Sequence, residues 1–213
     1  MKSLSLITAL VFVFNLASAG APSYQQAMEE SIASLNQASD SKQLLAVANR
    51  FERIARAEKD EWLPWYYAAY ATLNRAIGSD GASEKDQLLD QAQQYLDEAT
   101  AVEENESELV ALQGYVHTIR VTVDPANRGP QLAPLATQTL GKAVQMNPDN
   151  PRALFLLGQM QYGTAQFFGA DTAEACHLIQ QAVAKYESVT SEVALMPNWG
   201  EKSAQRMSEQ CKQ

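Results

Sequence analysis

The sequence has few of the residues from which catalytic and metal sites are commonly built. It contains two histidines and two cysteines, too few for a histidine metal centre or a cysteine-built zinc site. Its 16 lysines and arginines are outnumbered by 25 aspartates and glutamates, whereas nucleic-acid binding needs a basic surface. No glycine-rich phosphate loop, nucleophile elbow or paired-carboxylate motif is present. We therefore expect no nucleic-acid partner, no catalytic residues, no metal site and no cofactor.

The N-terminal residues have the three parts of a secretory signal peptide. Lys2 supplies a positive start, residues 4–16 are apolar, and the small residues Ala17 and Ala19 precede Gly20. The apolar stretch is shorter than the roughly 20 residues that cross a bilayer. We expect residues 1–19 to be removed on export. Residues 20–213 then form a single domain, periplasmic or secreted, with no membrane span in the mature chain.

Export changes the interpretation of the two cysteines, Cys176 and Cys211. In an oxidising compartment they can form a disulfide that holds the last helix against the preceding helices. The alternative is two unpaired thiols, because the sequence does not show whether the two Cα atoms come within bridging distance. We expect the disulfide.

The rest of the chain has the pattern of consecutive helices. Alanine, leucine, glutamine and glutamate dominate, and alternating β-branched runs are absent. Turn-forming residues interrupt the helical pattern at intervals, including 124–130 and 147–151. We therefore expect an all-α fold with about nine helices.

A spaced triplet of a small, a large and a small residue recurs along this helical region. Its four copies are Val47, Phe51 and Ile54; Ala92, Leu96 and Ala99; Ala136, Leu140 and Ala143; and Ala175, Ile179 and Ala182. Fifteen positions after a triplet comes a small residue of the next helix, at Ala69, Gly114 and Gly158. This indicates stacked helical hairpins, in which small residues let the first helix of one pair approach the second helix of the preceding pair.

These positions resemble the tetratricopeptide repeat (TPR) family over roughly residues 40–186. Trp65 stands at the family's early large position, and Pro148 at its closing proline. The resemblance implies an α-solenoid of about four antiparallel helix pairs with a C-terminal capping helix. The triplets recur every 45, 44 and 39 residues, longer than the family period of 34. We expect the extra residues at the turn between the two helices of each pair. The chain also resembles exported repeat proteins of Bacteroidetes.

The resemblance also implies a concave face lined by the first helix of each pair. The residues expected there are Tyr66, Tyr70, Tyr115, Phe155, Gln159 and Tyr162, with Arg152 at the rim. Such an aromatic, mostly uncharged groove suits peptides or sugars. The lysine, asparagine and arginine clamp that the family uses for peptide carboxylates is missing. The alternative is that the C-terminal helix fills the groove.

Phe167 and Phe168 lie in the turn of the last helix pair. Two adjacent phenylalanines are costly to expose, so they either pack under the hairpin or contact a partner.

The leading hypothesis for function is an exported, non-catalytic protein-interaction module that binds a peptide or protein partner on its concave aromatic face. The alternative is a small-ligand or glycan-binding protein that uses the same tyrosine-lined groove. An enzyme with a diffuse site is a third, weaker hypothesis.

Overall fold

The computed structural model describes residues 23–188 and 195–212. The expected signal peptide lies outside the described residues. Within them the chain forms nine α-helices and no strand. The helices are α1 (Tyr24–Gln37), α2 (Ser41–Ala57), α3 (Leu63–Ile77), α4 (Ala82–Val102), α5 (Ser107–Val123), α6 (Pro125–Met146), α7 (Pro151–Phe168), α8 (Ala173–Ser188) and α9 (Glu201–Gln210).

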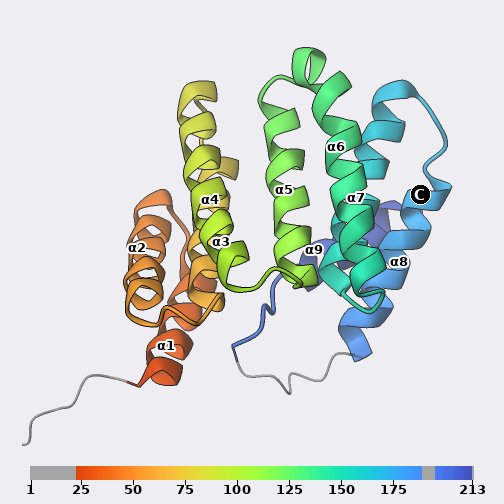
Figure 1. The fold of residues 1–213 in the computed structure, drawn as a ribbon. Helices are drawn as coiled ribbons and strands as arrows, with labels where there is room; N and C mark the ends of the chain where they lie inside the picture. Colours follow the sequence, from red (N-terminus) through yellow and green to blue (C-terminus); the bar gives the residue numbers. More distant parts are fainter. Residues whose placement is uncertain (1–22, 189–194, 213) are drawn as a thin grey trace, which may run out of the picture.

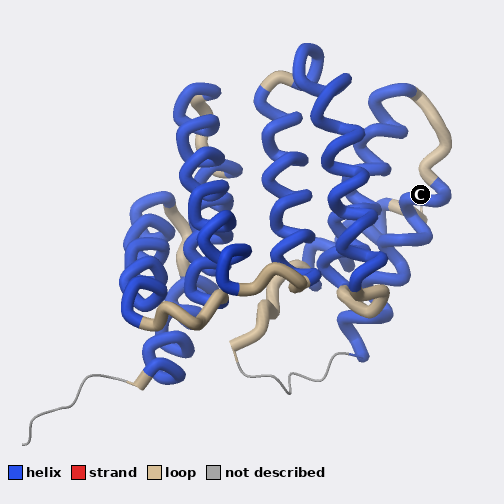
Figure 2. Tube along the Cα trace, in the orientation of Figure 1, coloured by secondary structure: helices blue, strands red, loops and turns tan. Residues whose placement is uncertain are grey.

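The helices pack side by side in chain order, with short loops at alternate ends (Figures 1 and 2). The most extensive contacts join α5 to α6 and α3 to α4, and α1 packs on α2 as α7 packs on α8. Contacts of α2 with α3, α4 with α5 and α6 with α7 join these pairs into a stack, and α9 packs on α8. The all-α stack of four antiparallel pairs with a final helix is confirmed.

Several helix boundaries follow from their own residues. The Asn150 side chain accepts hydrogen bonds from the backbone N–H groups of Arg152 and Ala153, and Pro151 occupies the first helical position of α7. The same helix ends at Gly169, whose φ of 65° is a left-handed conformation that favours glycine. These local signals set where α7 begins and ends.

The expectation of expanded turns inside the helix pairs is wrong. The extra residues lengthen the helices instead: α4 has 21 residues and α6 has 22, and only Asp124 separates α5 from α6. Pro130, expected to end a break at 124–130, lies inside α6, as does Pro134. Both are exposed. Backbone carbonyls that lose a helical N–H partner on an exposed face are satisfied by water, which lowers the cost of a proline there.

The glycines of the repeat pattern make a different contact from the one expected. A Cβ on Gly114 of α5 would lie 2.5 Å from Cγ of Leu140 in α6, and a Cβ on Gly158 of α7 would lie 2.8 Å from Cγ1 of Ile179 in α8. Each glycine therefore faces the large triplet residue of its own pair, and the expected contact with the preceding pair is wrong at these two positions. The bulky side chain at the centre of the triplet needs an opposing residue without a side chain.

Candidate functional site

The segment 195–200, which leads into α9, is called the strap here. It lies against α3, α5 and α7, the first helices of three of the pairs. The Tyr67 hydroxyl donates a hydrogen bond to the backbone carbonyl of Leu195 over 2.9 Å. The Trp199 indole N–H donates to the Tyr66 hydroxyl oxygen over 3.0 Å. Both tyrosines belong to α3, 128 and 133 positions away in the sequence. The strap is thus bound to the inner side of α3 by specific polar contacts as well as by packing.

Trp199 collects aromatic side chains from several helices. Its ring stacks on Tyr70, with centroids 4.4 Å apart and an interplanar angle of 13°. Tyr115 of α5 lies 6.1 Å away at an angle of 22°, and the Arg152 guanidinium of α7 lies 6.0 Å from the indole centroid. Together with Tyr66 these residues form the Trp199 cluster. Four of the seven residues predicted to line the concave face are brought together here.

Arg152 was expected at the rim of the groove, but it is buried and forms an ion pair. Its Nε and Nη2 atoms each donate to a different carboxylate oxygen of Glu108 over 2.7 Å. The two residues are only 7% and 4% exposed. Burial opposes the charge on Arg152, but the hydrogen bonds and attraction from Glu108 outweigh it and raise the pKa of Arg152 above its usual value. Glu108 thus holds the Arg152 guanidinium at a fixed position near the Trp199 ring.

The expected open groove is wrong where the strap covers it. Tyr66 is fully buried and Phe155 is 4% exposed, so neither meets solvent. Burial raises the pKa of Tyr66 well above its usual value and that of Tyr115 to about 12. The alternative expectation was that the C-terminal helix fills the groove. The groove is covered, but by the strap that precedes this helix, which contacts Tyr66 and Tyr70.

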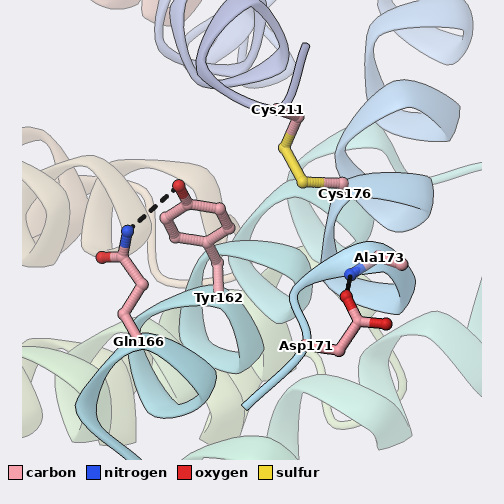
Figure 3. The surroundings of a disulfide bond; sticks show 6 residues. All are labelled: Tyr162, Gln166, Asp171, Ala173, Cys176 and Cys211. Carbon is pink, nitrogen blue, oxygen red and sulfur yellow. Dashed lines mark hydrogen bonds between the residues drawn. A yellow bond between two sulfur atoms is a disulfide. The ribbon is translucent and has the colours of Figure 1, made fainter. Parts of the chain in front are cut away.

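Gln159 and Tyr162, the other two predicted groove residues, are partly exposed on α7. The Tyr162 hydroxyl accepts a hydrogen bond from Gln166 on the same helix, close to the disulfide (Figure 3). Neither residue takes part in the aromatic contacts of the Trp199 cluster.

A disulfide joins Cys176 of α8 to Cys211, which follows the last residue of α9 (Figure 3). The two Cα atoms are 5.6 Å apart. The bond holds α9 against α8, so the end of the strap that leads into α9 is covalently tied to the helix stack. On the other side of the strap, the Tyr186 hydroxyl of α8 donates to the backbone carbonyl of Trp199 over 3.1 Å.

A pocket of about 530 Å³ lies beside the strap, between the α1–α2 turn and the C-terminal end of α3. Tyr70 and Trp199 contribute aromatic surface to it. Its apolar residues include Leu35, Leu44 and Ile77, and its polar residues include Arg75, Asn36, Asn74 and Asp40. We call it the Arg75 pocket. Of these residues only Tyr70 was predicted from the sequence, since the others share no motif and meet only when α1, α2, α3 and the strap pack together.

Other surfaces offer less. A second hollow of about 440 Å³ is lined by Arg120 and Arg128, which are paired with Asp90 and Asp86 at 2.7 and 2.6 Å, so its charges compensate one another. Within residues 23–188 and 195–212, no three histidine, cysteine, aspartate or glutamate side chains converge to hold a metal ion. Nor is any described helix both long and apolar enough to cross a membrane.

Phe167 and Phe168, at the C-terminal end of α7, are 68% and 75% exposed. Their rings contact each other edge to face, with centroids 5.1 Å apart. The interpretation in which they pack under the hairpin is therefore wrong, because α7 continues through both residues and leaves their rings exposed.

The fold and the site define an all-helical hairpin stack with a strap bound on its inner face and an aromatic pocket beside the strap. In the comparison with solved structures, the chain is similar to the HusA haemophore from Porphyromonas gingivalis. The TM-score is 0.81 and the identity 29%, over 92% of this chain and 96% of that one. No family model matches the chain, including any of the tetratricopeptide repeat family, and no curated protein matches it. A helical, repeat-like fold is shown, and membership of the TPR family is not.

Proposed function

We propose that this protein is a non-catalytic carrier of haem or a closely related flat, apolar ring compound. The observation that carries the proposal is the likeness to a haemophore over nearly the whole of both chains. This favours the small-ligand alternative over a peptide-binding groove.

The Arg75 pocket is the best candidate for the binding site. Its volume of about 530 Å³ lies within the roughly 300–1,000 Å³ typical of small-molecule sites. Tyr70 and Trp199 are already stacked at its edge, and stacking on such rings favours a flat aromatic ligand. The apolar side chains of Leu35, Leu44 and Ile77 provide further surface for an uncharged ring. The deeper part of the predicted groove, at Tyr66, is closed by the strap.

The residues of this pocket suit the ring of a haem better than its iron. No histidine, cysteine or methionine is among the described residues that line it. Burial raises the pKa of Tyr70 further above neutral, which makes the phenolate, the form that ligates iron, harder to reach. We therefore expect the pocket to bind the ring by stacking and apolar burial, without ligation of iron by the residues that line it.

A titration of the mature protein with haemin tests the proposal. We expect saturable binding with a shifted and sharpened Soret band, and similar saturation with metal-free protoporphyrin. Trp199→Ala should weaken binding, whereas Trp62→Phe, a change on the same helix stack but away from the pocket lining, should not. A Soret spectrum equal to that of haemin in buffer, at every protein concentration, would contradict the proposed function.

A protein partner is a second candidate function, and the exposure of Phe167 and Phe168 favours it. Adjacent exposed aromatics commonly mark a protein contact. A photo-crosslinking residue at position 168 should then capture one defined partner in the native host. The same residue at Glu209, an exposed position on α9, is the control. Equal labelling patterns from both positions would argue against a specific contact.

We also propose that the protein acts after export. The Cys176–Cys211 disulfide supports this, because thiols in the cytosol are kept reduced. N-terminal sequencing of the exported chain should begin at Gly20 or within about two residues of it. An intact Met1 on the folded, exported protein would contradict removal of residues 1–19.

A further inference from the structure

We propose that Arg75 binds a carboxylate of the ligand in the Arg75 pocket, so that this site selects flat apolar rings that carry a carboxylate at one edge. The inference rests on the proposed function and specifies which group of the ligand the protein recognises. It begins from the state of the Arg75 side chain.

Arg75 is held in place but lacks a charged partner among the described residues. It lies in the last turn of α3 and is half-buried. Its Nε donates to the Ser41 hydroxyl over 3.3 Å, a long hydrogen bond to an uncharged acceptor. Four other arginines pair with a carboxylate at 2.6 or 2.7 Å, namely Arg56, Arg120, Arg128 and Arg152. A positioned guanidinium with donors to spare can take a carboxylate through two parallel hydrogen bonds.

The rest of the pocket gives such a ligand one orientation. Arg75 and Ser41 define its polar end, at the start of α2, whereas Tyr70 and Trp199 define its aromatic side. A flat ring stacked toward Trp199 would therefore place an edge carboxylate near Arg75. Asp40 also lines the pocket, but its carboxylate caps α2 by accepting from the Gln43 backbone N–H over 2.8 Å. Its negative charge partly offsets that of Arg75, so a ligand carboxylate at this end depends on direct hydrogen bonds to the guanidinium.

The charge of the whole protein makes a local cation more important. The formal net charge is −9, so the long-range field opposes the approach of an anionic ligand. Arg152, the other arginine near Trp199, is already satisfied by Glu108 beneath the cluster. Arg75 is therefore the described cation best placed to offset the repulsion at this pocket.

The experiment compares haemin with its dimethyl ester, which keeps the ring and iron but has no free carboxylate. Both are titrated, in the same mixed solvent, against the wild-type chain, Arg75→Met and Arg50→Met. Arg50 is the matched control, because it also donates to a serine hydroxyl of a neighbouring helix, Ser34, over 3.3 Å but does not line the pocket. Far-ultraviolet circular dichroism and thermal melts establish that all three chains are folded.

We expect wild type and Arg50→Met to prefer haemin over the diester by about tenfold, the scale of one charged hydrogen-bonded contact at a partly exposed site. Arg75→Met should bind haemin about tenfold more weakly and should no longer distinguish the two ligands. If haemin binds but Arg75→Met keeps the full preference, the role of Arg75 is refuted while the carrier function stands. If the wild type binds neither ligand, the proposed function fails and this inference fails with it.

Discussion

The close approach of α7 to α8 predicts opposite effects for the same substitution at two glycines of α7. A Cβ at Gly158 would lie 2.8 Å from Cγ1 of Ile179 and 3.0 Å from the carbonyl oxygen of Ala175. Carbon atoms prefer separations of about 3.5–4.0 Å, and the carbonyl belongs to a helix backbone that cannot rotate away. A Cβ at Gly163, five residues further along, would meet no atom within 4 Å. Gly158→Ala should therefore destabilise the fold, and Gly163→Ala should stabilise it.

The expected magnitudes follow from two opposing contributions. Overpacking costs about 1–3 kcal/mol, whereas replacing an interior helical glycine by alanine gains up to about 1 kcal/mol. Gly158→Ala should lose about 1 kcal/mol net and Gly163→Ala should gain about 0.5–1 kcal/mol. For a chain of this length, 1 kcal/mol corresponds to about 2–4 °C in melting temperature. The two variants should therefore melt about 3–8 °C apart.

Urea denaturation followed by circular dichroism and by tryptophan fluorescence provides the assay. Coincident transitions would show that one cooperative unfolding step is measured. An unchanged slope against urea would assign the shift in midpoint to stability rather than to a change in the unfolded chain. If Gly158→Ala proves as stable as Gly163→Ala, the close contact between α7 and Ile179 of α8 does not exist in solution.

Three further predictions concern buried or cross-linked groups. Arg152→Met should cost about 3–5 kcal/mol in unfolding free energy, because it leaves the Glu108 carboxylate buried without its partner. Adding Glu108→Gln should restore part of the lost unfolding free energy, measured by urea denaturation. No recovery in the double variant would contradict the explanation by an unpaired buried carboxylate. Replacing both Cys176 and Cys211 by serine should lower the free energy of unfolding by at most about 4 kcal/mol, the loop entropy of a 35-residue separation. An unchanged melting temperature would refute a structural role for the disulfide. Burial and nearby Arg120 lower the pKa of His117, so the unfolded chain binds the proton more readily than the folded one. The free energy of unfolding should therefore fall as the pH drops below about 6.5. Thermal melts across that range should show a smaller loss in His117→Gln.

The helices and their pairing could be predicted from the sequence because the signals are local. The triplets around Leu140 and Ile179 mark one face of a helix, and both residues are fully buried in the structure. Gly114 and Gly158 were recognised as positions of close approach, although the helix each one meets was assigned wrongly. The predicted turn lengths are also wrong, because α6 continues through Pro130, a residue type that favours a break, on an exposed face.

The candidate site depended on contacts between residues far apart in the chain. The bond from Trp199 to Tyr66 joins positions 133 apart, and the Arg152–Glu108 ion pair spans 44. The local sequence around one of these residues does not specify its partner. The position of the strap depends on the packing angles of all the helices between α3 and α8. The same is true of Arg75, whose neighbours in its pocket come from two other helices and the strap. Hydrophobic periodicity determines which faces of the helices are buried, and only the packed stack determines which polar and aromatic side chains meet.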